Sequence, residues 1–176
     1  MRLETERLVL RPWRKGDEEP LVRHANNRQV WLSLRDLFPH PYTLDDARDF
    51  IALNSARSGP PTNLAIEHAG EPIGSIGLHS LSDVCRFTAE VGYWIGEAFW
   101  GRGLATEALR RFTDYAFEQF PCERLEGWIF ATNPSSGRVL EKAGYEYEAT
   151  LCRSAFKDGQ FLDSHLYVRF RPRSPG

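Results

Sequence analysis

The feature that most constrains the fold is a strand, a turn with two glycines and a helix, which follow one another between residues 90 and 116. Residues 90–95 are rich in β-branched and aromatic side chains, as strands are. From Leu104 onward, apolar residues recur at helical spacing and form one apolar face. The turn at 101–103 therefore precedes a helix N-terminus, where unpaired N–H groups and the positive end of the helix dipole face outward. Glycines allow close approach of a ligand, so the pattern predicts a cradle for a pyrophosphate.

Nucleotide-binding motifs match this turn poorly. A mononucleotide P-loop needs Gly-Lys-Ser/Thr to reach the outer phosphates and Mg²⁺, and the turn has none. A dinucleotide fold prefers a third small residue where Thr106 stands, and an acidic residue after the next strand, where Thr132 and Asn133 stand. The remaining alternative is a helix entered through glycines with no ligand.

The pattern of elements predicts a mixed sheet flanked by helices. A strand-like run at 124–131 follows the cradle helix, so the two strands around that helix should run parallel in a β-α-β unit. Upstream, Asp17 and Thr43 are suitable N-caps for two helices. The segment 28–42 between these helices is aromatic and irregular. We also expect a hairpin around 70–72, a short helix after 133–134, and two final strands joined near 158–159.

Composition limits the class of protein. The 176 residues, 41% of them hydrophobic and 26% charged, are typical of one globular domain. The net charge of −2 argues against nucleic-acid binding, and we find no apolar run of membrane-spanning length or signal-like N-terminus. Three widely spaced cysteines fit neither a disulfide framework nor a metal site, so we expect packing cysteines, no metal and a cytoplasmic location.

Two signatures resemble the GNAT acetyltransferases. Residues 92–109 are similar to the central motif of that superfamily, and Asn133-Pro134-Ser135-Ser136 followed by 139–145 is similar to its second signature at the right distance. The opening residues 5–12 and the closing Lys157-Asp158-Gly159 with Asp163 resemble the Rim-type branch, which includes enzymes acting on ribosomal-protein N-termini. One departure is Trp100, which stands where the superfamily commonly has Gln or Arg.

The resemblance implies both a fold and a reaction. The fold would be an α+β GNAT-like single domain over residues 1–176, with a central, mostly antiparallel twisted sheet, a parallel splayed strand pair at the cofactor cleft and flanking helices. The activity would be an acetyl-CoA-dependent N-acetyltransferase acting on a primary amine. The residues implied to hold acetyl-CoA are Trp94, Ile95, Gly101, Arg102, Gly103, Leu104, Ala105, Thr106, Asn133 and Ser136. Backbone glycines at Gly92 and Gly96 favour a bulged strand that a ligand approaches, or else simple close packing.

Acyl transfer from a thioester needs a neutral amine, a polarised carbonyl and a stabilised thiolate. By resemblance, Ser136 is the candidate acid for the thiolate, ahead of Tyr145, which occupies a packing position. The alternative is that Asn133 and Ser136 only cap the following helix. Glu90 is the candidate base, acting directly or through water, with His79 second. The alternative for Glu90 is a solvated carboxylate at the strand edge.

The acceptor site should form from the segment 31–42 and the loop near 158–163. Trp31 and Tyr42 would wall it and Glu90 would hold a cationic amine, whereas Trp13 and Phe38 are expected to cover the helices. The acceptor would be a protein N-terminus or a small amine, and the branch often forms homodimers. A non-catalytic acyl-CoA-binding sensor or interaction module of the same fold is the alternative. The acceptor and the length of the acyl chain depend on pocket shape, which the sequence leaves open.

Overall fold

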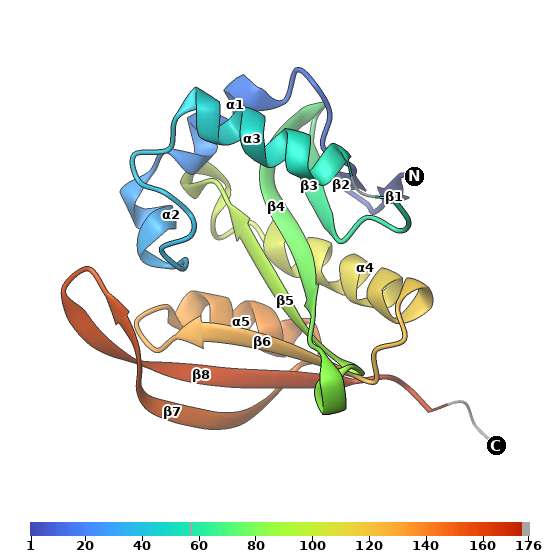
Figure 1. Ribbon diagram of the computed structural model, residues 1–176, viewed down its shortest axis with the longest axis vertical. Helices are drawn as coiled ribbons and strands as arrows, with labels where there is room; N and C mark the ends of the chain where they lie inside the picture. Colours follow the sequence, from blue (N-terminus) through green and yellow to red (C-terminus); the bar gives the residue numbers. More distant parts are fainter. Residues whose placement is uncertain (57, 174–176) are drawn as a thin grey trace.

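A computed structural model describes residues 1–56 and 58–173 (Figure 1). Eight strands in this part of the chain form one sheet, which is accompanied by five α-helices. The helices are α1 (Glu18–Ala25), α2 (Arg28–Leu32), α3 (Leu44–Ser55), α4 (Leu104–Gln119) and α5 (Pro134–Lys142), with 3₁₀ turns η1 (Asp83–Cys85) and η2 (Glu97–Phe99). The strands are β1 (Leu3–Glu4), β2 (Leu8–Arg11), β3 (Asn63–His68), β4 (Glu71–Ser80), β5 (Thr88–Ile95), β6 (Arg124–Phe130), β7 (Glu146–Lys157) and β8 (Gln160–Phe170).

The sheet has the strand order β1-β2-β3-β4-β5-β6-β8-β7. Every neighbouring pair is antiparallel except β5 and β6, which the crossover through α4 makes parallel. The predicted mixed fold with one parallel pair is therefore confirmed.

The helices cover the two faces of the sheet. The apolar side of α4 packs on β2, β4 and β5, and α5 packs on β6, β7 and β8. Helix α1 covers β4 on the opposite face and α3 packs on α1, and Trp13, Leu21 and Ile51 form a second buried cluster there. Trp13 is thus a core residue, as expected. Alternation along β5 sends Tyr93 to the α4 face and Trp94 to the α1–α3 face.

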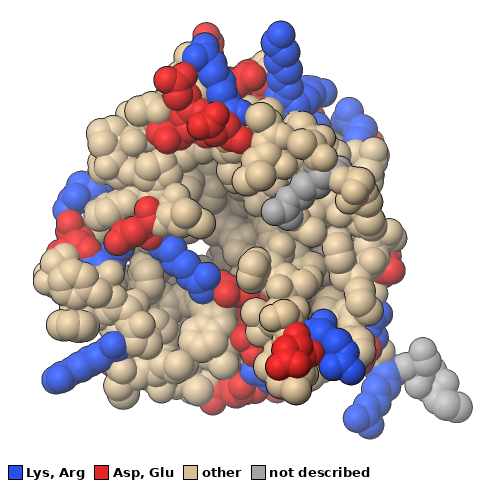
Figure 2. Space-filling view, in the orientation of Figure 1, with Lys and Arg blue, Asp and Glu red and all other residues tan. Residues whose placement is uncertain are grey.

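The parallel strands β5 and β6 pair over a short length only. Residues Thr88 to Glu90 pair with Arg124 to Glu126, after which β5 continues along β4 to Ile95 and β6 continues along β8. The two strands therefore diverge, as Figure 1 shows. Figure 2 shows that this face of the molecule is hollowed between the α1–α3 helices and the β6–β8 strands. The expected splayed pair is confirmed.

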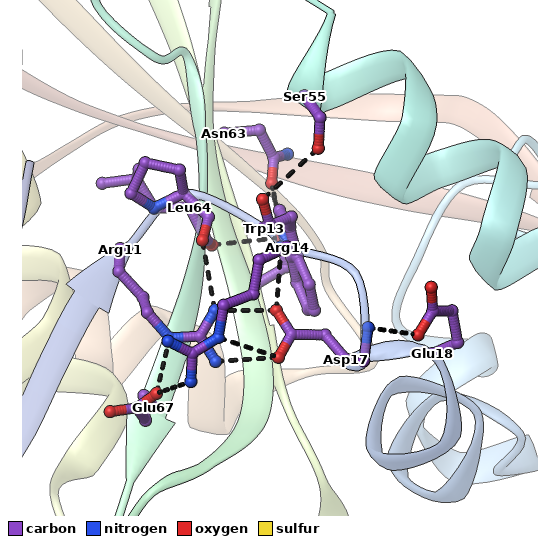
Figure 3. A network of polar contacts seen from close by, with 12 residues as sticks. Arg11, Trp13, Arg14, Asp17, Glu18, Ser55, Asn63, Leu64 and Glu67 are labelled. Carbon is purple, nitrogen blue, oxygen red and sulfur yellow. Dashed lines mark hydrogen bonds and ion pairs between the residues drawn. The ribbon is translucent and has the colours of Figure 1, made fainter.

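A buried ion-pair network fixes the N-terminal segment to the sheet (Figure 3). Arg11 is only 3% exposed and contacts Glu67 at 2.5 Å and both carboxylate oxygens of Asp17 at 2.7 and 2.9 Å. Asp17 is the N-cap residue of α1, as expected, but its side chain makes no capping hydrogen bond. Its carboxylate binds Arg11 and the Arg14 N–H instead. The predicted cap at Thr43 is confirmed, because Thr43 and Asp46 form a capping box.

Three other expectations need correction. Residues Arg28–Leu32 form α2 in a segment expected to be irregular, because Asn27 caps the N–H groups of Gln29 and Val30. Strand β5 pairs with β4 without a register shift, so the expected bulge is not present. Cys122 is buried, but Cys85 and Cys152 are exposed and are not packing residues.

No helix in the described ranges combines the length and apolar character needed to span a bilayer.

Candidate active site

A cleft of about 1880 Å³ runs through the opening between β5 and β6. Residues Gly101 and Gly103 to Thr106 line it at the N-terminus of α4, and Asn133 and Ser136 line it from α5. Glu90 and Tyr42 line the α1–α3 side. The strands thus bring most of the expected site residues to one continuous space.

Strand β5 directs specific backbone groups into this opening. Gly96 N donates to Ile73 O at 2.8 Å, and alternate residues of an antiparallel strand point their amide groups to opposite sides. The amide groups of Trp94 therefore point toward β4, and those of Tyr93 and Ile95 point toward the opening. Trp100 Nε1 donates to Ile95 O at 2.7 Å, so the side chain that replaces the usual Gln or Arg binds the protein's own backbone. The Ile95 N–H and the Tyr93 amide groups remain directed at the cleft.

The predicted cradle has the backbone conformation that its glycines suggest. Gly101 and Gly103 have φ values of +75° and +77°, in the left-handed region that favours glycine. The first helical hydrogen bond of α4 is from Glu107 N to Gly103 O, so the N–H groups of Leu104, Ala105 and Thr106 lack helical acceptors. These groups and the helix dipole suit an anion. The Arg102 side chain does not line the cleft; its guanidinium lies 5.5 Å from the centroid of the Phe99 ring.

The two glycines of β5 have different surroundings. A Cβ atom on Gly92 would meet nothing within 4 Å, and Gly92 lines the cleft. A Cβ atom on Gly96 would lie 2.9 Å from the His24 ring. Gly92 thus leaves room for a ligand, whereas Gly96 permits close packing.

Ser136 has a partner that the sequence analysis missed. The hydroxyl of Tyr93 lies 2.8 Å from Ser136 Oγ and donates to Ser136 O at 3.1 Å. Burial raises the pKa of Tyr93, although the Ser136 contact opposes this, so the phenol stays protonated at neutral pH. Asn133 Oδ1 accepts from Ser136 N at 3.3 Å and caps α5. The Asn-x-x-Ser pattern therefore does form a cap, and it also presents Ser136 to the cleft.

Tyr145 lies in the core away from the cleft. Its hydroxyl is 2.8 Å from Thr113 Oγ1, and burial raises its pKa to about 12. The ring is 2% exposed, which confirms the predicted packing position.

Glu90 lies in the cleft among charged neighbours. Arg35 Nη2 donates to Glu90 Oε1 at 2.6 Å, and the Glu90 side chain is 21% exposed. On the sheet, Glu90 is opposite His79 on β4 and Glu126 on β6. Glu126 is bound by Arg124 and Trp128. Glu90 is thus neither freely solvated nor isolated, and its partner Arg35 comes from the segment expected to hold the acceptor.

The β7–β8 hairpin lines the cleft and is bound to the segment 31–42. Lys157 Nζ lies 2.7 Å from Asp36 Oδ1 and 3.5 Å from the centroid of the Trp31 ring. Trp31 does not line the cleft, and the cation on its face is the chain's own Lys157. Arg28 makes a second bridge to Asp158 at 2.7 Å.

The aromatic residues Tyr42 and Phe38 line the cleft on the side of the second core. Tyr42 is 5% exposed and packs against Phe38 with ring centroids 4.9 Å apart. Phe38 in turn contacts Trp94. Phe38 therefore connects the wall of the cleft to the second core, while Tyr42 contributes a small exposed area.

Comparison with known proteins decides the family. A profile of the acetyltransferase (GNAT) domain matches residues 7–146. This chain belongs to the GNAT acetyltransferases. It is 29% identical to the uncharacterized N-acetyltransferase YoaA of Bacillus subtilis (strain 168) over 173 residues, which cover 97% of each protein. It is 28% identical to the ribosomal-protein-serine acetyltransferase of Escherichia coli (strain K12) over 168 residues, covering 94% of this chain and 93% of that enzyme.

A solved structure has the same fold. Spermidine N-acetyltransferase from Vibrio cholerae, in complex with CoA and spermine, has a TM-score of 0.78 with 21% identity and covers 94% of this chain and 96% of that protein. This GNAT protein is an acetyl-CoA-dependent N-acetyltransferase that transfers an acetyl group to an amine. The relatives bear out the resemblance to the Rim-type branch and favour an enzyme over a non-catalytic acyl-CoA binder.

Proposed function

We propose that residues 1–176 act as one acetyltransferase domain and bind acetyl-CoA through the opening between β5 and β6. The observation that carries this is the short β5–β6 pairing, which leaves the Tyr93 amide groups and the Ile95 N–H facing the cleft. The pantetheine arm would bind these groups, as an added strand does. The pyrophosphate would accept from the N–H groups of residues 103–106, where the dipole of α4 favours negative charge.

Ser136 would stabilise the departing thiolate. The amine nitrogen forms a bond to the acetyl carbon, the C–S bond breaks, and the sulfur takes up the electron pair. When Tyr93 donates to Ser136 Oγ, the hydrogen of the serine hydroxyl is directed to the sulfur. Because burial keeps Tyr93 protonated, its role would be to orient Ser136.

Glu90 would accept the proton of the amine, directly or through water, after separating from Arg35. An ammonium group of the acceptor could replace Arg35 at the carboxylate, because both are cations that bind carboxylate oxygens. The acceptor would then enter beside the 31–42 segment and the β7–β8 hairpin, where Tyr42 lines the cleft and Lys157 covers Trp31.

The acceptor class is a primary amine, either a protein N-terminus or a small amine. The named relatives support both, because one modifies a ribosomal-protein serine and another is a spermidine acetyltransferase. We also propose a cytoplasmic location, supported by the three free thiols of the described chain, and a homodimer, supported by the Rim-type resemblance.

The test is release of free thiol from acetyl-CoA with pooled acceptors: N-terminal peptides, polyamines, aminoglycosides and amino acids. Release with one pool identifies the acceptor class. If calorimetry shows that acetyl-CoA binds but no pool causes thiol release, the result would count against transfer to these amines. It would favour the alternative of a non-catalytic acyl-CoA-binding protein. Ser136→Ala should abolish most turnover without weakening acetyl-CoA binding.

A further inference from the structure

The opening Thr5-Glu6-Arg7 motif has no role in the site described so far, yet its side chains reach the cradle. Thr5 Oγ1 donates to Glu107 Oε1 at 2.6 Å, and Arg7 N donates to the same oxygen at 2.8 Å. Arg7 Nε donates to Glu107 Oε2 at 2.8 Å. Glu107 lies in the first turn of α4, so this carboxylate joins the β1–β2 turn to the start of the cradle helix.

Arg7 also binds the cradle backbone itself. Its Nη1 donates to Arg102 O at 2.9 Å, and its Nη2 lies 3.6 Å from the position of a Cβ atom on Gly103. The peptide group between Arg102 and Gly103 is planar and trans, so its N–H points opposite to its C=O. Fixing the Arg102 carbonyl on Arg7 therefore directs the Gly103 N–H away from Arg7. Gly103 lines the cleft and Arg7 does not.

Arg7 has a second, electrostatic effect. Glu107 is 16% exposed and stands beside a proposed anion site, where its charge alone would repel a phosphate. Arg7 Nη2 lies 2.7 Å from Glu107 Oε2 and compensates that charge. Both effects act on the pyrophosphate, and neither acts on the acetyl end of the cofactor.

We propose that Arg7, held by Glu107, which Thr5 also binds, is a positioning residue that aims the Gly103 N–H at the pyrophosphate of acetyl-CoA. This rests on the proposed placement of the pyrophosphate at the cradle. Arg11 of the same N-terminal motif has a different task, because it is buried with Asp17 and Glu67 in the core network.

The test compares two donors that differ in the pyrophosphate. Calorimetry on the full-length protein measures dissociation constants for acetyl-CoA and for S-acetylpantetheine, which lacks the nucleotide and the pyrophosphate. Arg7→Gln should weaken acetyl-CoA binding by about tenfold, the effect of one well-placed hydrogen bond. It should leave S-acetylpantetheine binding unchanged. Arg7→Lys, which keeps the charge, should have a smaller effect on acetyl-CoA.

Arg110→Gln is the matched control, because Arg110 lies on α4 and also binds a carbonyl, that of Lys142, away from the cradle. It should not change either constant. If Arg7→Gln weakens the binding of both donors equally, Arg7 has a general structural role. If it weakens neither, Arg7 has no role in binding. Either result overturns the inference. If Arg7→Gln does not fold, the dissociation constants of the two donors are compared in Arg7→Lys instead. These binding measurements need no acceptor, so a transferase assay that fails would not affect the inference about Arg7. Unchanged acetyl-CoA binding in Gly103→Val would instead refute the placement of the pyrophosphate at the cradle.

Discussion

The hydroxyl of Tyr93 on β5 and that of Ser136 on α5 lie 2.8 Å apart, although 43 residues separate them in the chain. The pair stands at the edge of the opening where the two parallel strands diverge. A serine hydroxyl rotates freely unless a partner fixes it. Tyr93 supplies such a partner when its single hydroxyl hydrogen goes to Ser136 Oγ rather than to the Ser136 carbonyl oxygen, which lies 3.1 Å away.

Removing either hydroxyl should reduce turnover rather than binding. We expect Ser136→Ala to lower kcat by about a hundredfold, within the range for a positioned proton donor, and Tyr93→Phe to lower it by about tenfold. The dissociation constant of acetyl-CoA should stay within about twofold, because the pyrophosphate contacts remain. Thiol release and calorimetry give the two quantities. Tyr147→Phe is the control, since its hydroxyl binds Thr150 on the exposed surface. Full activity of Ser136→Ala would remove Ser136 from the mechanism.

Glu90 and His79 are opposite each other on neighbouring strands and can be separated by mutation. Glu90→Gln keeps the shape but cannot accept a proton, so kcat/KM for the acceptor should fall by about a hundredfold. Acetyl-CoA affinity should not change. Glu146→Gln, at an exposed carboxylate on β7, is the control. If His79→Gln loses this activity and Glu90→Gln keeps it, the base is His79.

The cradle should tolerate no side chain at Gly103. Valine strongly disfavours a φ of +77°, and its Cβ atom would lie 3.6 Å from Arg7 Nη2, so the substitution would disturb the backbone that presents the N–H groups of the cradle. We expect Gly103→Val to weaken acetyl-CoA binding by at least about tenfold. Gly70→Val is matched in backbone strain, because Gly70 has a φ of +86° with nothing within 4 Å of its Cβ position, but it lies in the β3–β4 turn. Equal losses in the two variants would attribute the effect to strain rather than to the cradle.

The sequence predicted local features well because periodicity and turn chemistry are local. The amphipathic α4, the cap at Thr43 and the parallel strands flanking α4 follow from spacing and handedness alone. Contacts between distant segments were not predictable from spacing. Tyr93 carries no signal that it reaches Ser136, and Lys157 carries none that it lies on Trp31.

The errors came from competition between partners. Asp17 has the residue type and position of an N-cap, but a buried arginine offers a charged partner and takes the carboxylate. Gly92 and Gly96 are equivalent in sequence, and only their neighbours show that one leaves open space and the other accommodates His24. Sequence reasoning therefore selected residues that line the cleft better than it assigned their partners.

The Arg11 network should dominate the stability of the N-terminal half. Arg11→Met would leave Asp17 and Glu67 as buried carboxylates without their main cation, at a cost of about 3–5 kcal/mol in the free energy of unfolding. Arg14 touches the same acids, but its side chain is 59% exposed, so Arg14→Met should cost less than about 1 kcal/mol. Urea unfolding followed by tryptophan fluorescence measures both. A similar cost for the two variants would contradict this account.

Glu107 should make part of the stability depend on pH. Burial opposes its ionisation, but hydrogen bonds from Thr5 and Arg7 outweigh this and lower its pKa. A carboxyl whose pKa is lowered by folding stabilises the native state above its unfolded pKa, about 4.3, and this contribution is lost as pH falls through the native value. Glu107→Gln should therefore cost about 1–2 kcal/mol at pH 7, and the difference from the wild type should shrink below about pH 4. Glu118→Gln, at an exposed position on the same helix, should show no such difference. Urea unfolding at pH 7 and at pH 4 or below measures the change, and a wild-type advantage that persists at the lower pH would show that packing, not charge, is the contribution of Glu107.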